Sequence, residues 1–221
     1  MDPVGIFGGT FDPIHYGHLR TAFELRRILR LSEVRFLPNG DPPHRDGAIA
    51  KAVHRLGMVK AATAEQSGFV VDDRELRRDG PSYSVDTLLG LREELPERSL
   101  CLIVGMDAFL GLPKWHRWQK VLQLAHVIVA HRPGWQVPDA GTLGELLKNR
   151  GTDAVDDLHT ARAGKIYVHA VTQLEISSTA LRRLICNGGD PRFLIPDTVR
   201  AYMSEHNCYP LEKLRCKQSD V

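Results

Sequence analysis

Near the start of the chain, two glycines and two histidines have a spacing suited to phosphate binding. The segment from Gly8 to His18 reads GGTFDPIHYGH and follows a short apolar run, residues 4–7. Paired glycines let the backbone approach a ligand closely, and the N–H groups at a helix N-terminus attract anions. An apolar strand, a glycine turn and a helix start therefore predict a phosphate site.

The two histidines add chemistry to this turn. His15 and His18 are three residues apart, so on a helix that begins near Ile14 they share a face and can both point toward the turn. If protonated, each could donate a charge-assisted hydrogen bond, worth about 1.5–3 kcal/mol, to charge that develops on transferring phosphate oxygens. Such a pair would stabilise a transition state without covalent catalysis.

Other interpretations of this segment are weaker. A glycine turn after a strand can be a simple tight connection. The HxxH spacing also occurs in zinc sites, but no third His, Cys or carboxylate stands at a recognisable zinc spacing nearby, so no metal ligands are assigned. The dinucleotide fingerprint GxGxxG fails because Gly8 and Gly9 are adjacent and no third glycine comes before Gly17. A hydride-transfer enzyme is therefore disfavoured.

A second helix start with polar residues lies near the C-terminal end. Ser177, Ser178 and Thr179 are good N-cap residues, and an apolar helical pattern follows them. Arg182 is three residues after Thr179, which places a guanidinium, a hydroxyl and N–H groups on one face. Taken alone, the segment predicts either a second phosphate site or a capped helix with a surface arginine.

The elements that must position these residues alternate between strands and helices. Apolar runs typical of strands occur at 4–7, 33–37, 69–71, 100–104, 127–130 and 166–170. The alternation predicts an α/β protein with a Rossmann-like, doubly wound, mostly parallel sheet and helices on both faces. Ligands of such sheets bind beyond the carboxyl ends of the strands at the switch point, where the glycine turn would lie. Asp107 should emerge beside it, either as a ligand contact or as a helix cap.

Helical patterns fill the connections between these strands. The helix after the glycine turn should direct an apolar stripe toward the core: Leu19, Ala22, Phe23, Leu25, Ile28 and Leu29. Further helices are expected after Pro81, at 142–149 and after Pro196. We expect one domain over residues 1–210, with a surface insertion at 133–164 and a polar tail at 211–221.

Composition narrows the setting of the protein. A chain of 221 residues with a formal net charge of +2 and dispersed Lys and Arg argues against a nucleic-acid surface. Four cysteines without a CxxC pair fit a reducing compartment. No signal peptide is recognised and no apolar run approaches the roughly 18 residues of a membrane span, so a cytoplasmic location without a membrane partner is expected. The sequence leaves the oligomeric state open, and a homo-oligomer is compatible with it.

Six motifs in order resemble one known family along nearly the whole chain. The chain is similar to the bacterial nicotinate mononucleotide adenylyltransferases, which belong to the nucleotidyltransferase superfamily with an HxGH motif. The motifs are GGTFDPIHYGH at 8–18, PNG with PPHR at 38–45, GPSYSVDT at 80–87, GMD at 105–107, KWHRW at 114–118 and ISSTALR at 176–182.

The resemblance implies a role for each motif. It implies catalytic roles for His15, His18 and Arg182. It implies ATP contacts at Gly8, Gly9, Thr10, His15, His18, Arg45, Gly105, Asp107, Ser178, Thr179 and Arg182. It implies contacts to the pyridine mononucleotide at Asn39, His44, Ser84, Thr87, Trp115 and His116, with Trp115 stacked on the ring. Two positions depart from the family, which usually has Lys at position 45 and often Thr at position 84.

The activity implied is transfer of the adenylyl group of ATP to nicotinate mononucleotide, giving deamido-NAD and pyrophosphate, with Mg²⁺ carried mainly by ATP. The substrate phosphate is itself the nucleophile, so no catalytic triad is needed. Alternatives are an enzyme for nicotinamide mononucleotide, a phosphopantetheine adenylyltransferase, and a non-catalytic nucleotide-binding module. Phosphopantetheine enzymes are usually shorter and lack the KWHRW and PSYSVDT matches.

Overall fold

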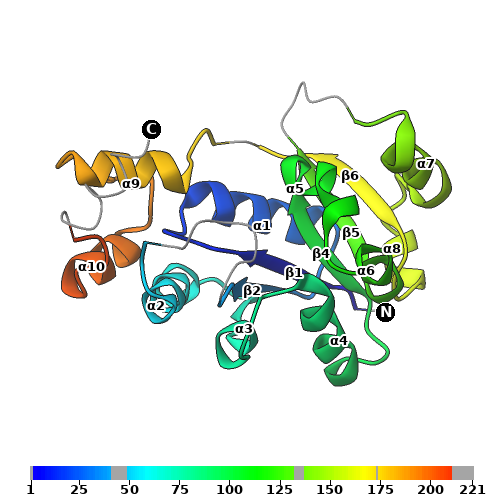
Figure 1. Cartoon of the computed structure of the whole chain (residues 1–221), viewed down its shortest axis with the longest axis horizontal. Coiled ribbons are helices and arrows are strands. Elements are labelled where there is room, and N and C mark those ends of the chain that lie inside the picture. Colours follow the sequence, from blue (N-terminus) through cyan, green and yellow to red (C-terminus); the bar gives the residue numbers. More distant parts are fainter. Residues whose placement is uncertain (1, 41–48, 132–136, 173, 211–221) are drawn as a thin grey trace.

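The strands form one parallel sheet. The computed structural model describes residues 2–40, 49–131, 137–172 and 174–210. Its strands are β1 (Val4–Gly9), β2 (Glu33–Pro38), β3 (Phe69–Val71), β4 (Leu100–Gly105), β5 (His126–His131) and β6 (Ile166–Ala170). Their order is β3-β2-β1-β4-β5-β6, and every pairing is parallel (Figure 1). The six predicted strands are confirmed, and the described sheet is parallel throughout rather than mostly parallel.

Helices cover both faces of this sheet. They are α1 (Tyr16–Ile28), α2 (Ala52–Thr63), α3 (Arg74–Arg77), α4 (Ser84–Glu94), α5 (Met106–Leu110), the 3₁₀ turn η1 (Leu112–Lys114), α6 (Trp118–Leu124), α7 (Gly141–Arg150), α8 (Asp157–Thr160), α9 (Ser178–Cys186) and α10 (Asp197–Glu205). In Figure 1, α9 and α10 lie at one end of the molecule and α7 at the other, beyond β6.

The two faces carry separate apolar cores. Side chains from α1, α2, α8, α9 and α10 share one buried cluster, and those from α4, α5, α6 and α7 share the other. Strand β4 contributes to both, because Leu100 and Leu102 enter one cluster while Cys101 and Ile103 enter the other. Alternate residues of a strand face opposite sides, so a strand between two helical layers is apolar throughout. The predicted Rossmann-like, doubly wound fold is confirmed.

The chain reverses its direction of travel across the sheet at β1. It passes from β1 through β2 to β3 and then returns to place β4 on the other side of β1. β1 pairs with β2 up to Gly9, but its pairing with β4 ends where Ile6 meets Leu102. The carboxyl ends of β1 and β4 therefore separate, which opens the sheet edge at the switch point.

Helix α1 differs in two details from its prediction. It begins at Tyr16, because His15 is the N-cap residue with an extended backbone, φ −146° and ψ 171°. Ala22, Leu25 and Leu29 are buried as expected, but Ile28 is 36% exposed. The core-facing stripe is thus narrower than predicted, since Ile28 is the last residue of the helix and lies at its solvent edge.

Residues 133–164 connect β5 to β6. In the described part, from residue 137, they form α7 and α8, and Leu143 and Leu158 are buried in the two different apolar clusters. Gly151 also bridges to Ile166 at the start of β6. This connection is therefore anchored on both faces, which supports our proposal of a single domain. Among the described residues, no helix is both long and apolar enough to cross a membrane.

Candidate active site

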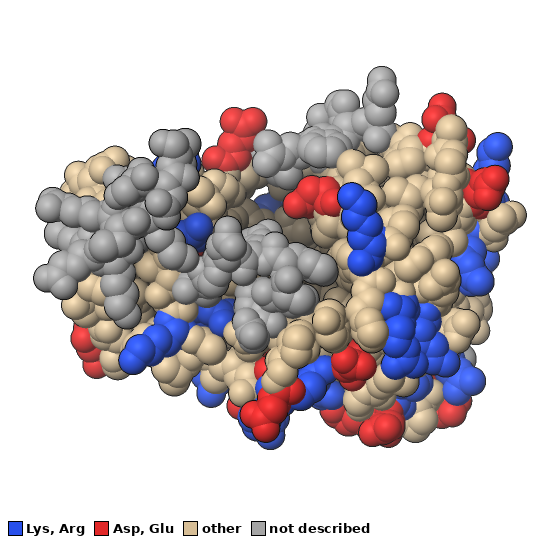
Figure 2. All heavy atoms as spheres, viewed as in Figure 1, with Lys and Arg blue, Asp and Glu red and all other residues tan. Residues whose placement is uncertain are grey.

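A cleft of about 560 Å³ lies at the switch point, beyond the carboxyl ends of β1 and β4. Its volume is typical of sites for small ligands. Figure 2 shows the surface hollowed near the middle of one face. The predicted site residues that line the cleft are Gly8, Gly9, Thr10, His15, His18, Asn39, Ser84, Thr87, Gly105, Asp107, Trp115, His116 and Ser178.

Of the predicted residues that the structure describes, two are not among those that line the cleft. Thr179 and Arg182 lie on α9 beside it. His44 and Arg45 fall outside the described residues, so their roles stay predictions from the sequence.

The two histidines of the HxGH motif lie against each other at the start of α1. Their rings are stacked with centroids 3.7 Å apart, and both line the cleft. The backbone N–H of His15 donates to Nδ1 of His18 over 3.3 Å. Because Nδ1 accepts this bond, a neutral His18 carries its proton on Nε2. The sequence prediction that both rings share one face is confirmed.

His15 is neutral in the absence of a ligand. Its side chain is buried, and this desolvation lowers the pKa of His15 to about 4. Its Nδ1 has no hydrogen-bond partner among the described residues. Burial of His15 therefore disfavours, near neutral pH, the doubly protonated histidine pair considered from the sequence. A bound phosphate would favour the charged form of the ring.

Gly17 is required by this arrangement. A Cβ atom at position 17 would lie 2.9 Å from Nδ1 of His15, closer than real Cβ contacts. Any larger residue would push the imidazole away. The glycine between the histidines thus makes room for the His15 ring.

An aromatic wall behind His18 was not predicted. Phe11 meets the His18 ring edge to face with centroids 5.1 Å apart, and Phe7 lies 6.2 Å away. Phe11 is buried with a left-handed backbone, φ 48°. Its position inside the glycine-histidine segment was the available signal, but only the fold shows which ring it contacts.

Asp12 holds together segments that are distant in the sequence. Its buried carboxylate accepts hydrogen bonds from the backbone N–H of Ile49 and Ala50 and from the Tyr209 hydroxyl, at 2.9, 3.2 and 2.8 Å. The glycine turn, the segment before α2 and a residue four positions after the end of α10 therefore meet at one side chain.

Arg55 supports the same turn from α2. It is 1% exposed and donates to the carbonyl oxygens of Thr10, at 2.8 Å, and Gly40, at 3.1 Å. Burial lowers the pKa of Arg55, while the nearby Asp12 carboxylate raises it. Arg55 thus connects the loops that follow β1 and β2. Its place in an otherwise helical stretch gave no indication of this role.

Helix α9 is attached to the glycine-histidine segment by polar contacts. Ser177 caps it by accepting from the Ala180 N–H, and the Ser178 hydroxyl donates to the carbonyl of Pro13 over 2.9 Å. Arg182 donates to the carbonyl of Asp12 at 2.6 Å and to the Thr179 hydroxyl at 3.2 Å. The predicted second helix start is therefore confirmed, beside the first. Direct contact of Arg182 with a phosphate stays a prediction.

At β4, the GMD motif lies at the rim of the cleft. Gly105 is the N-cap residue of α5 and Asp107 is in its first turn, so the alternative in which Asp107 caps the helix is wrong. A Cβ at position 105 would come within 2.6 Å of Asp107 Oδ1. Glycine therefore leaves space for the Asp107 carboxylate at the cleft.

Aromatic side chains form another part of the cleft wall. His116 stacks obliquely on Tyr83 with centroids 4.6 Å apart, and both line the cleft with Trp115. Trp118 begins α6 and packs against the apolar cluster, as expected for a packing residue. This part of the wall is suited to a flat ring.

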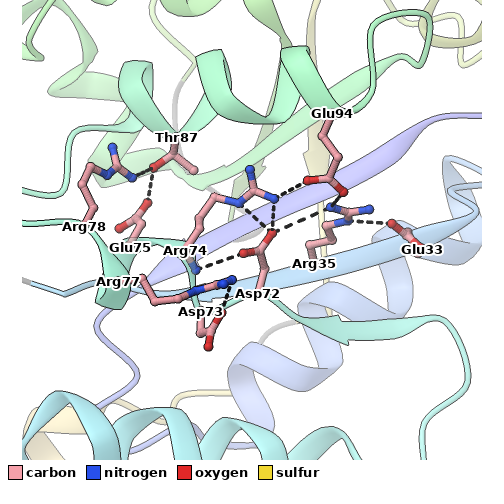
Figure 3. A network of polar contacts seen from close by, with 10 residues as sticks. All are labelled: Glu33, Arg35, Asp72, Asp73, Arg74, Glu75, Arg77, Arg78, Thr87 and Glu94. Carbon is pink, nitrogen blue, oxygen red and sulfur yellow. Dashed lines mark hydrogen bonds and ion pairs between the residues drawn. The ribbon is translucent and has the colours of Figure 1, made fainter.

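Beside these rings is a polar group that the sequence reasoning missed. Glu75 on α3 is buried, lines the cleft, and accepts a 2.6 Å hydrogen bond from the Thr87 hydroxyl (Figure 3). The same hydroxyl accepts from Arg78 over 2.7 Å. Burial raises the pKa of Glu75. Because Thr87 already uses its donor on Glu75, its hydroxyl has no proton left to donate to a substrate.

A parallel sheet of this strand order, with a glycine turn and a helix start at its switch point, defines a nucleotide-binding α/β protein. The model of the Cytidylyltransferase-like family matches residues 6–184, and the chain belongs to this family.

Relatives extend the similarity over nearly the whole chain. A protein of Aeromonas hydrophila named probable nicotinate-nucleotide adenylyltransferase is 51% identical over 207 residues, which cover 94% of this chain and 97% of that protein. One of the same name from Methylococcus capsulatus is 46% identical, covering 93% and 99%. The solved Plasmodium falciparum nicotinic acid mononucleotide adenylyltransferase complexed with NaAD superposes with a TM-score of 0.72 over 96% of this chain and 98% of that one. At 18% identity this last match bears on the fold alone.

Proposed function

We propose that the protein transfers the adenylyl group of ATP to nicotinate mononucleotide, giving deamido-NAD and pyrophosphate in NAD biosynthesis. The observation that carries the proposal is one cleft lined both by a phosphate-type turn with two histidines and by stacked aromatic rings. The names of relatives about half identical to this chain support it.

In the proposed reaction, a phosphate oxygen of the mononucleotide attacks the α-phosphorus of ATP in line. The new P–O bond forms as the bond to the β-phosphate oxygen breaks, and its electron pair leaves with pyrophosphate. The substrate supplies the nucleophile, so the protein acts by positioning and by stabilising charge.

The part of the cleft with the phosphate-type turn has the groups for this task. Nε2 of His18 donates to the transferring phosphate, and the N–H groups and hydroxyl of Gly8, Gly9 and Thr10 complete the cradle. His15, with an unpartnered ring nitrogen, takes up a proton as the triphosphate binds. In this assignment Arg182 and Thr179 contact ATP only when the nucleotide reaches α9, since both lie beside the cleft in the unliganded protein.

Mg²⁺ fits this site as a companion of ATP. Among the described residues, no group of three or more His, Cys, Asp or Glu side chains could hold a metal ion. The triphosphate oxygens would provide most of its ligands, and Asp107, which lines the cleft, is a carboxylate that could hold the ion as well. When bound, Mg²⁺ neutralises the charge of the leaving pyrophosphate.

The aromatic part of the cleft is assigned to the mononucleotide. In this assignment Trp115 stacks on the pyridine ring, and the backbone N–H of His116 donates to its carboxylate. Asn39 and Ser84, which also line the cleft, are assigned to the same substrate. ATP and the mononucleotide are the partners we propose, in the cytoplasm and without nucleic acid or membrane, and a homo-oligomer is compatible with the cleft.

The first test measures pyrophosphate release from ATP with nicotinate mononucleotide, nicotinamide mononucleotide and phosphopantetheine. We expect the acid mononucleotide to give the highest kcat/KM. A better rate with either other acceptor would replace the substrate assignment, and ATP binding without pyrophosphate release from any of them would favour a non-catalytic nucleotide-binding module.

A further inference from the structure

A carboxylate lines the part of the cleft where our proposed function places an anionic base. Glu75 is 6% exposed and shares the cleft wall with Tyr83, Thr87 and Trp115. A fixed negative charge here would repel a nicotinate carboxylate and would tolerate the neutral amide. Something must offset this charge if the acid is the better substrate.

The contacts of Glu75 keep it in place. Thr87 donates a 2.6 Å hydrogen bond to Oε1, and Ser82 is a second hydrogen-bonding neighbour of the carboxyl. The Ser82 hydroxyl also accepts from the N–H of Gly40 over 3.1 Å. Glu75 is therefore held between α3, α4 and the loop that follows β2.

Arg78 supplies the opposing charge. Its Nη2 donates to the Thr87 hydroxyl over 2.7 Å, so Thr87 bridges the guanidinium and the carboxylate. The attraction between Arg78 and Glu75 lowers the pKa of Glu75, against the dominant effect of burial and the smaller repulsion from Asp72. Nη1 of Arg78 is buried and has no hydrogen-bond partner among the described residues.

The neighbouring arginines are already engaged elsewhere. Figure 3 shows Arg74 and Arg35 bound to Asp72 and Glu94, while Arg77 pairs with Asp73. Within the network drawn there, Arg78 is the cation that contacts Thr87.

We propose that Glu75 and Arg78, bridged by Thr87, form a charge-compensated pair that sets the preference for an acidic over an amide pyridine mononucleotide. This inference rests on the proposed function and deepens it. Arg78 offsets the negative charge of Glu75 in the cleft wall, so the carboxylate of the substrate is not repelled. Glu75 in turn offsets the charge of the Arg78 guanidinium, so that it does not bind anions non-specifically. Both act through charge near the base, not as catalytic residues.

The test compares kcat/KM for the acid and amide mononucleotides at saturating ATP. Arg78→Met leaves Glu75 uncompensated and should lower the acid-to-amide ratio by on the order of tenfold, the size expected for one charge about 12 Å away at an effective dielectric constant of about 20. Glu75→Gln, which keeps the size of the side chain, should raise the ratio. The double variant should return it toward the wild-type value.

Shifts of the acid-to-amide ratio in opposite directions in Arg78→Met and Glu75→Gln distinguish this role from a structural one. A group that only holds the loop would change kcat/KM for both substrates in the same sense and proportion. Arg77→Met and Glu93→Gln are matched controls, because both side chains are exposed and outside the cleft, and they should leave the ratio unchanged. If Arg78→Met does not fold, as judged by thermal unfolding, Arg78→Lys retains the charge and should retain most of the ratio.

The outcomes distinguish the two proposals. A wild-type enzyme that releases no pyrophosphate with either mononucleotide overturns the proposed function and this inference with it. The wild type could instead be active while Arg78→Met and Glu75→Gln leave the acid-to-amide ratio of kcat/KM unchanged, or shift it in the same direction. Either result overturns only the role of the pair.

Discussion

At the scale of single residues, the two histidines of the motif differ in their surroundings. His18 accepts a backbone N–H at Nδ1, which places the proton of a neutral ring on Nε2, while burial lowers the pKa of His15 to about 4. The two rings are therefore not equivalent, although the motif presents them as a symmetric pair. In the proposed reaction, His18 donates from Nε2, whereas His15 gains its charge when a phosphate binds.

This division predicts the effect of removing His18. His18→Ala should lower kcat about a hundredfold to a thousandfold, the usual cost of losing one donor to a transition-state oxyanion. Steady-state pyrophosphate release measures this change, and urea unfolding shows whether folding is affected. His206→Ala is the control, since His206 is exposed on α10's C-terminal side and outside the cleft. Turnover near the wild-type rate in His18→Ala would remove His18 from the mechanism.

At the scale of elements, the start of α1 has a residue that lowers the stability of the helix but leaves space in the site. Gly17 lies in the first turn of the helix, where alanine would be intrinsically favoured, yet its missing Cβ leaves room for the ring of His15. The first turn of the helix thus contains a residue of low helix propensity because the His15 ring in the cleft needs the space. Gly90 in α4 has no such duty, since a Cβ there would make ordinary contact at 3.5 Å with Arg74.

Two glycine substitutions separate these effects. Gly17→Ala should lower kcat/KM for ATP at least about tenfold, because a 2.9 Å contact displaces the His15 imidazole. Gly90→Ala should leave kcat/KM unchanged and raise the free energy of unfolding by about 0.5–1 kcal/mol. Enzyme kinetics and urea unfolding of both variants give the comparison. Unchanged kinetics in Gly17→Ala would mean that the His15 position does not matter to ATP.

At the scale of the whole molecule, the sequence was most informative where the fold is most repetitive. Short apolar runs mark the strands, and β3 and β6 were located at their observed bounds, although both are edge strands that are only partly buried. Helix ends were less accurate, because the N-cap position of His15 depends on its backbone angles and not on its residue type.

The site could be predicted only as far as its motifs reach. Residues beside the glycine turn and at the strand ends were found, since parallel strands bring their carboxyl ends to one edge. Glu75, Arg55 and Tyr209 were missed. Tyr209 meets Asp12 across 197 positions of the sequence, and no local spacing reveals such a contact.

Buried histidines also link the stability of the whole chain to pH. The pKa of His15 is lowered to about 4 by burial, and the pKa of His126 is lowered mainly by the same cause. Between about pH 6.5 and 4, the unfolded chain therefore binds protons that the folded chain does not. The free energy of unfolding should fall as the pH falls through this window, and above pH 6.5 neither histidine contributes a slope.

The size of this effect can be assigned to His15. At about 1.4 kcal/mol per pKa unit, His15 alone should account for up to about 3 kcal/mol between pH 7 and 4. His15→Gln cannot titrate, so its free energy of unfolding should fall less steeply than that of the wild type, while His206→Gln, altered at an exposed position, should follow the wild-type curve. Urea unfolding at half-unit pH steps measures the slopes. Added ATP should flatten the dependence of the wild-type free energy of unfolding on pH, because it stabilises only the folded form and favours protonated His15. If wild type and His15→Gln lose stability in parallel as the pH falls, burial does not keep this histidine neutral.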